Sequence, residues 1–365
     1  MTQLDESAWA SPNLLMTRER IAEIQAALQT GDPVLTDAYN ELIAVADRAM
    51  DETPDPIHGA MRAPGFYTAR REEQRAVAWP LRRDGRLAHA LALACVLSGN
   101  PEYGAKAREF IFAWVDNMTH PEHGNSWWWV FLLQHRGDTP IIIAYSFPLY
   151  IYAFDLLRGE GLLSQEDQAR FREWLRRYVD YHRREELYKN NHHNWQVLFL
   201  LTSAHALQDE ALFHRAVRYY HNGIRGQIRG DGALPRELWR GKRSGTYTLM
   251  ALEGMVQAVH IAEGHGIDHL RNLKSRRGGT LRDAVRFYTE YLGDPDTWRT
   301  HTNADELNVP ETIADWGWVF ELPARWWGEE PFRPYLAKRP YGFEEPRVYT
   351  MEFATLHFYI TPEND

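Results

Sequence analysis

Apolar residues recur with helical spacing along most of this chain, and that spacing restricts the possible folds more than any other feature. Segments of this kind cover residues 86–97, 103–115, 139–157, 165–182, 195–207, 210–227, 247–262 and 281–291. Residues 17–50 are typical of two further amphipathic helices, separated by Gly31-Asp32-Pro33. Strand-like alternation is scarce, and only residues 347–360 could hold a short strand. We therefore predict an all-α protein with little or no β-structure.

Two segments of the chain share a helical-hairpin pattern. Residues 94–107 and 204–216 each contain a helix end, a tight polar turn, and a second helix that opens with an acidic and an aromatic residue. Repeated hairpins either stack as a solenoid or close into a toroid. Because aromatic residues make up 13% of the chain and suit packing between wide helices, we expect an incomplete α/α toroid. No stretch has the composition of a linker, so residues 1–365 are expected to form one domain.

The connection at residues 51–80 has no clear period and is rich in proline, glycine, arginine and aromatic residues. A connection of this length is often a lid or a substrate-binding loop. An ordered structural loop is the alternative, and the sequence leaves both open.

The charge and the cysteine content exclude several classes of partner. A formal net charge of −9 disfavours a nucleic-acid partner, which needs a basic surface. The single cysteine, Cys95, lies in an apolar run, so we expect it to be a small buried residue. With one cysteine, no disulfide can form within the chain. We find neither a signal-peptide pattern nor an apolar run long enough to span a membrane. We therefore expect no membrane partner, and either a cytoplasmic or a mature exported protein, with the oligomeric state open.

A dense polar cluster, Tyr188-Lys189-Asn190-Asn191-His192-His193-Asn194-Trp195, comes directly before an apolar run at residues 197–201. Asparagine favours helix starts, because its side chain bonds backbone N–H groups. The cluster is therefore expected at the start of a buried helix, with polar side chains facing a cleft. For any one of these residues, a capped helix start with a hydrogen-bonded histidine is the simpler alternative.

A second dense segment covers residues 231–247 and carries four cations, Arg236, Arg240, Lys242 and Arg243. In a chain of net negative charge this is a local positive patch that suits an anionic ligand, unless it is a solvated basic turn. Tyr247 opens an apolar helix four residues after Arg243. Nearby guanidinium groups favour a phenolate and lower its pKa, so we expect Tyr247 to take part in proton transfer.

Together the two segments resemble the alginate lyase superfamily. The residues that carry the resemblance are Asn190-Asn191-His192 with Trp195, Asp231-Gly232, Pro235, Glu237-Leu238, Arg240, Arg243 and Tyr247. They are similar to mannuronate-specific alginate lyases of polysaccharide lyase family five and to glucuronan lyases, and the match is strongest between residues 188 and 264. The resemblance implies an α/α toroid that cleaves a 1,4-linked polyuronate by β-elimination and leaves 4,5-unsaturated ends.

This reaction removes a weakly acidic proton from C5 of the sugar. It needs the neighbouring carboxylate to be neutralised, a base near C5, and an acid for the leaving oxygen. By resemblance, Asn191 neutralises the carboxylate, Arg240 binds the substrate and Tyr247 is the catalytic acid. His192 is then the base or a second neutralising group. If the proton and the leaving oxygen lie on one face of the sugar, Tyr247 could serve as both base and acid. If they lie on opposite faces, His192 as base and Tyr247 as acid is more natural.

Other residues are candidates for binding the sugar chain: Arg243, His193, Trp128, His135, Arg136, Arg62 and Arg71. The chain departs from the pattern of family five at His193 and Asn194, and at Thr248, where that family has a histidine. These departures leave polymannuronate, glucuronan and other polyuronates open as the substrate. The histidines lack metal-ligand spacing, so we assign no metal and no cofactor.

Two other functions remain open from the sequence. A glycoside hydrolase on the same toroid would need two carboxylates across the scissile bond. Asp231 and Glu237 would be that pair, with Glu253 as a third candidate. A non-catalytic relative would bind the polyuronate without turning it over.

Overall fold

The computed structural model describes residues 4, 6–121, 137–183, 187, 189–294, 296, 298, 302, 313–336, 339 and 350–360. Its longer helices are α1 (Arg18–Thr30), α2 (Pro33–Met50), α3 (Arg71–Ser98), α4 (Pro101–Asn117), α5 (Thr139–Gly159), α6 (Gln165–His182), α7 (Asn191–Leu207), α8 (Glu210–Gln227), α10 (Ser244–Gly264) and α11 (Leu281–Gly293). Two short strands, β1 (Gly59–Met61) and β2 (Met118–Pro121), pair in parallel. The prediction of an all-α protein with little β-structure is confirmed.

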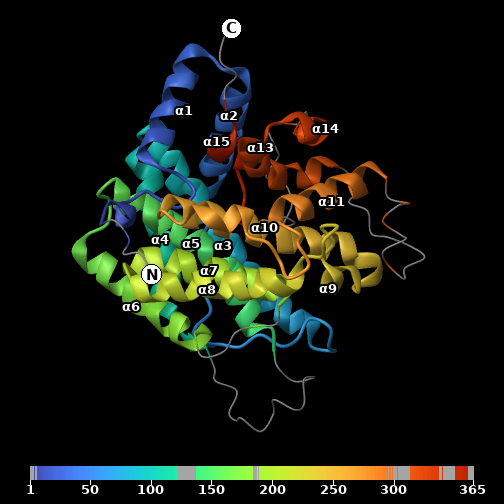
Figure 1. Cartoon of the computed structure of the whole chain (residues 1–365). Coiled ribbons are helices and arrows are strands. Elements are labelled where there is room, and N and C mark those ends of the chain that lie inside the picture. Colours follow the sequence, from blue (N-terminus) through green and yellow to red (C-terminus); the bar gives the residue numbers. More distant parts are fainter. Residues whose placement is uncertain are drawn as a thin grey trace.

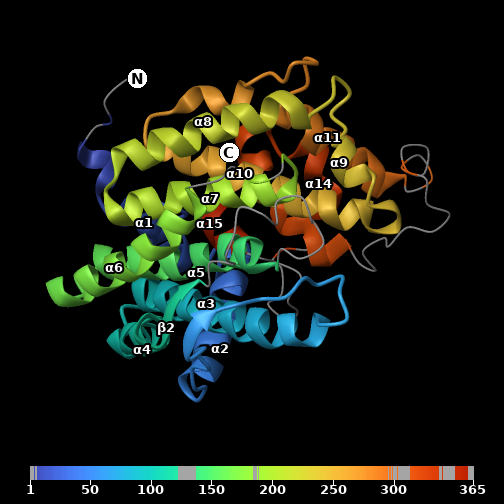
Figure 2. The same cartoon turned by 90° about the horizontal axis from the view of Figure 1, so that it is seen from below.

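The long helices form an inner and an outer layer. In the inner layer, α3 packs against α5, α5 against α7, and α7 against α10 (Figures 1 and 2). Nearly every residue of α5, α7 and α10 is buried, whereas α4, α6 and α8 each bury one face against the inner helices. This division explains why the inner helices are almost continuously apolar in sequence and the outer ones amphipathic. The two predicted hairpins are α3–α4 and α7–α8.

The inner helix α5 is held on both sides. By length and composition α5 could cross a membrane, but 89% of its most apolar window is buried inside the fold. Tyr150 donates a hydrogen bond to the Leu81 carbonyl at 2.7 Å, and Tyr152 donates to Gln257 Oε1 at 2.9 Å. These bonds tie α5 to α3 and α10, so α5 is a core helix of the protein.

Capping residues in the sequence set the ends of several helices. Ser164 and Asp167 form a reciprocal capping box at the start of α6, and Asp209 accepts a hydrogen bond from the Leu212 N–H at the start of α8. Gly99 ends α3 with a φ of 75°, in the left-handed region that glycine adopts most readily. The predicted bounds of α6 and α8 therefore agree with the structure.

Two predictions about secondary structure are wrong. The irregular connection does not extend to Pro80, because α3 begins at Arg71 and continues through Pro80. A proline inside a helix removes one backbone hydrogen bond, but the packing of α3 against α4 and α5 keeps it helical. The described part of the predicted C-terminal strand is instead a short helix, α15 (Ala354–Phe358).

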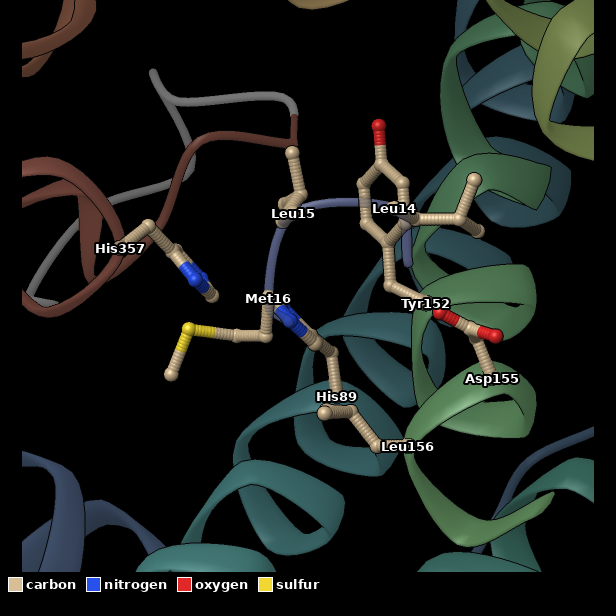
Figure 3. Close-up of a pocket in the computed structure, with 8 residues that line it drawn as sticks. All are labelled: Leu14, Leu15, Met16, His89, Tyr152, Asp155, Leu156 and His357. Atoms are coloured by element: carbon tan, nitrogen blue, oxygen red, sulfur yellow. The ribbon is translucent and has the colours of Figure 1, made fainter. Parts of the chain in front are cut away.

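A small internal cavity lies beside α3, α5 and α15 (Figure 3). His89 and His357 face each other there with ring centroids 5.5 Å apart, and their ring nitrogens have no hydrogen-bond partner among the described residues. Burial lowers the pKa of His89 to about 4, so this imidazole is neutral at neutral pH. The cavity is about the size of one water molecule and is lined by Leu14, Leu15, Met16, His89, Tyr152, Asp155, Leu156 and His357. It is therefore too small for a sugar and is separate from the predicted site.

Replacing Gly223 by alanine tests the packing of α8 on α7. A Cβ at Gly223 would lie 2.5 Å from both Cδ2 and Nε2 of His193. We expect Gly223→Ala to destabilise the fold by about 1–3 kcal/mol through overpacking, seen as a lower melting temperature in calorimetry. Gly226→Ala on the same helix is the matched control, because a Cβ there meets no described atom within 4 Å. Equal melting temperatures for the two variants would contradict this packing.

Candidate active site

Five residues of the predicted polar cluster, Asn191 to Trp195, form the start of α7. Asn190 is the N-cap, and its side chain accepts a hydrogen bond from the His192 N–H at 3.1 Å. Asn191 begins the helix and is fully buried, as is Trp195 one turn later, whereas His192 is partly exposed. The predicted start of a buried helix is confirmed, four residues earlier than the apolar spacing indicated.

A buried carboxyl group ties this turn to the short helix α9 (Pro235–Leu238). Glu237 is 1% exposed, its Oε1 accepts a hydrogen bond from the Asn191 N–H at 2.7 Å, and its Oε2 accepts one from Asn191 Nδ2 at 2.9 Å. Burial raises the pKa of Glu237 to about 7, although the bonds from Asn191 and the charges of Arg240 and Arg236 lower it. The Oδ1 of Asn191 is buried and has no hydrogen-bond partner among the described residues.

Arg240 and Tyr247 lie against each other. A short turn, η3 (Gly241–Arg243), leads the chain from α9 into α10, and the Arg240 guanidinium carbon lies 4.0 Å from the centre of the Tyr247 ring. The Tyr247 hydroxyl is hydrogen-bonded to the Tyr67 hydroxyl, and Arg243 donates a hydrogen bond to Tyr67 at 3.1 Å. Two cations and two phenols therefore form one cluster.

The pKa of Tyr247 is raised, whereas the sequence analysis expected it to be lowered. Burial raises this pKa most, the hydrogen bond and charge of Tyr67 raise it further, and only Arg240 lowers it. The expectation was wrong because desolvation of a phenolate outweighs one stacked cation here. Tyr247 is consequently a neutral phenol at neutral pH and can donate a proton.

His192 can accept a proton, in contrast to Tyr247. Burial, with a smaller contribution from the Arg240 charge, lowers the pKa of His192 to about 4. Its imidazole is therefore neutral at neutral pH and can accept a proton. A proton acceptor and a proton donor thus lie beside the same guanidinium group, which is the separation of acid and base that proton-transfer sites use.

The other predicted binding residues are not all part of this cluster. His193 is buried against α8, where its Nε2 bonds the Tyr219 carbonyl at 2.7 Å, so the structure contradicts its predicted contact with a sugar. The guanidinium carbon of Arg71 lies 4.3 Å from the centre of the Phe66 ring. Phe66 directly precedes Tyr67 in the chain. Arg62 is exposed directly after β1. Trp128, His135 and Arg136 lie outside the described residues.

Tyr67 belongs to this cluster but was not predicted from the sequence. It lies 180 residues from Tyr247 and is 63% exposed. The only signal for it was the aromatic and arginine content of the connection at 51–80, which did not single out one side chain. Trp239, directly before Arg240, is 83% exposed and was also not noted.

The carboxylates considered for a hydrolase have other roles. Asp231 is exposed and forms an ion pair with Arg229. Glu253 is fully buried and accepts a hydrogen bond from the Thr350 N–H at 2.8 Å. Glu237 is bonded to Asn191, so these three carboxylates each have another partner and do not form the pair that hydrolysis requires.

The described part of the chain does not bring three His, Cys, Asp or Glu side chains close enough together to hold a metal ion. The polar groups of the cluster are amide, imidazole, guanidinium and phenol, with one buried carboxyl group beneath them. These groups can bind an anion and move protons.

Comparison with known proteins identifies relatives of this fold. The alginate lyase family model matches residues 44–298. A polysaccharide lyase from Stenotrophomonas maltophilia strain K279a is 24% identical over 282 residues, which cover 73% of this chain and 79% of the relative.

Solved structures with the same fold are also alginate lyases. The enzyme from Bacteroides ovatus superposes with a TM-score of 0.74 at 18% identity, over 96% of this chain and 100% of that chain. Alginate lyase A1-III from Sphingomonas species A1 superposes with a TM-score of 0.70 at 18% identity, over 98% of this chain and 100% of that chain. Variants of A1-III have been solved in complex with a tetrasaccharide. These superpositions confirm the α/α toroid.

A helical toroid with this set of relatives defines the class of protein as a polysaccharide lyase. Because the family model covers more than half of the sequence, the chain belongs to the alginate lyase family.

We predict that His192 stays neutral throughout the physiological pH range. In a sample with labelled histidine, its imidazole resonances, assigned with the His192→Gln variant, should keep the positions of a neutral imidazole between about pH 5.5 and pH 8, because the pKa lies near 4 rather than about 6.5. The measurement is an NMR pH titration. A midpoint at the value of free histidine would contradict the neutral state of His192.

Proposed function

We propose that this protein cleaves a 1,4-linked polyuronate, polymannuronate or glucuronan, by β-elimination and leaves a 4,5-unsaturated uronate at the new end. The observation that carries the proposal is the position of Arg240, beside the neutral imidazole of His192 and the neutral phenol of Tyr247. Elimination next to a carboxylate needs a cation, a base and an acid at one place. The tetrasaccharide complexes of the structural relatives support an oligosaccharide as the ligand.

The substrate carboxylate binds Arg240 and the first turn of α7. A guanidinium group donates in a planar fork that matches a carboxylate, and the amide of Asn191 adds a second donor. The start of α7 contributes the partial positive charge of a helix N-terminus. Neutralising the carboxylate in this way stabilises the negative charge that develops when the C5 proton leaves.

His192 accepts the C5 proton, and Tyr247 gives its proton to the leaving oxygen. The electron pair of the C5–H bond forms the C4–C5 double bond while the bond from C4 to oxygen breaks. In polymannuronate and glucuronan the proton and the leaving oxygen lie on one face of the ring, which suits two groups beside one guanidinium. Transfer of a proton from His192 to Tyr247 through solvent restores the site.

The assignment of the base rests on the pKa values of the two groups. Tyr247 could act as both base and acid only if it were a phenolate before the reaction, and its raised pKa disfavours that form. His192 is unprotonated at neutral pH and needs no prior deprotonation. We therefore assign the base to His192 and the acid to Tyr247.

A panel of polymers tests the proposed reaction. Purified protein is incubated with polymannuronate, polyguluronate and glucuronan, and the ultraviolet absorbance of the unsaturated uronate is followed. We expect the absorbance to rise with polymannuronate or with glucuronan. No rise with any polymer would contradict the proposal, and new reducing ends without absorbance would indicate a hydrolase instead.

Replacing Tyr247 by phenylalanine keeps the ring and removes the proposed acid together with its hydrogen bond to Tyr67. We expect Tyr247→Phe to lower kcat by about 10²–10⁴-fold, the usual contribution of general acid catalysis, while the Kd for the polymer changes little. Tyr103→Phe is the control, because the Tyr103 hydroxyl bonds Asp47 on α2, away from this cluster. Normal turnover by Tyr247→Phe would show that another group protonates the leaving oxygen.

A further inference from the structure

Asn191 has an unsatisfied oxygen at a position where the proposed function needs a donor. Its Nδ2 donates to Glu237 Oε2 at 2.9 Å, while its Oδ1 is buried without a hydrogen-bond partner among the described residues. A buried acceptor without a partner is destabilising. An oxygen is also the wrong atom to meet a substrate carboxylate, because two acceptors repel each other.

The orientation of this amide is set by its hydrogen-bond partners, since the oxygen and the nitrogen of an amide are nearly equal in size. A half-turn of the Asn191 amide exchanges the two atoms. Oδ1 then faces Glu237 Oε2, and Nδ2 takes the unpartnered position with both of its hydrogens. This orientation is stable only when Oε2 carries a proton, because two bare oxygens would otherwise face each other. The bond from the Asn191 N–H to Oε1 is kept in both orientations.

We propose that Glu237 acts as a neutral carboxylic acid that positions Asn191: its Oε2–H donates to Oδ1, and the Nδ2 hydrogens bind the substrate carboxylate. The inference rests on the proposed function, because it takes a uronate carboxylate as the ligand of Asn191. Oδ1 is shielded from solvent in the unliganded chain, so the groups that cover it must move as the substrate binds. Glu237 touches no substrate atom in this account and is a positioning residue.

The groups around Glu237 favour opposite protonation states of its carboxyl group. The two hydrogen bonds that Asn191 on α7 donates to Glu237 favour the anion, and so do the charges of Arg240 and Arg236 in its own segment. Next to it, His192 is neutral, and from α10 the neutral phenol of Tyr247 lies against Arg240. Burial favours the neutral acid more strongly than these bonds and charges favour the anion, and it raises the pKa of Glu237 to about 7. A bound substrate carboxylate adds a second negative charge and shifts the balance further toward the neutral acid.

Glu237→Gln tests this role, because glutamine has the same shape and its amide nitrogen can donate to Oδ1 at every pH. In the wild-type protein we expect kcat/KM to fall by about tenfold or more between about pH 6.5 and pH 8.5 as Glu237 ionises. The fall should be absent in Glu237→Gln. Glu263→Gln is the matched control, because Glu263 pairs with Arg271 at the far end of α10, and it should keep the wild-type pH profile. A purely structural role for Glu237 would change the melting temperature without removing the alkaline fall.

Infrared spectroscopy reads the carboxyl group itself, without substrate. The wild-type protein should show the C=O stretch of a protonated carboxyl group that disappears with a midpoint near pH 7 and is missing from Glu237→Gln. If Glu237→Gln does not fold, Asn191→Ala assigns the band instead, because loss of the amide partner must shift its midpoint.

The outcomes separate this inference from the proposed function. An alkaline fall and an infrared band that both vanish in Glu237→Gln support the inference. The same pH profile in the wild type and Glu237→Gln, or no protonated carboxyl group that titrates near pH 7, would overturn it. If the wild-type protein turns over no polyuronate, the proposed function fails and Asn191 has no uronate to bind, while the infrared band still shows whether Glu237 is a neutral acid.

Discussion

The contact between Glu237 and the first residue of α7 holds the site together. The start of a helix leaves backbone N–H groups without partners inside the helix, and here the Asn190 side chain and the Glu237 carboxyl group each accept from one of them. The same carboxyl group joins α7 to α9, and the chain continues from α9 to Arg240. The relative position of His192 and Arg240 therefore depends on one buried acidic side chain.

The toroid supplies the rest of the geometry. The inner helices α7 and α10 pack along each other, and their first turns carry His192 and Tyr247 (Figure 1). Burial of these turns changes the proton affinity of both groups, lowering the pKa of His192 and raising that of Tyr247. Burial in the fold thus leaves a neutral imidazole and a neutral phenol beside the Arg240 guanidinium group at neutral pH.

Features that depend on neighbouring residues in the chain could be predicted from the sequence. Features that depend on tertiary packing could not. The bounds of α6 and α8 follow from their capping residues, and the Asn190 cap was expected from its position before an apolar run. Pro80 in the sequence indicates the end of a loop, but α3 continues through it because it packs against α4 and α5. Tyr67 contacts Tyr247 in the folded protein although the two residues lie 180 positions apart in the chain. The arginines near Tyr247 are visible in the sequence, whereas the burial that outweighs them is not.

The central claim is that the chain breaks a glycosidic bond by elimination, and the masses of the products test it most directly. A uronate oligosaccharide of known length is treated with the protein, and both products are weighed by mass spectrometry. Elimination adds no water, so the account predicts that the two product masses sum to that of the substrate and that one product is unsaturated. Products that together exceed the substrate by one water, with saturated ends, would contradict it.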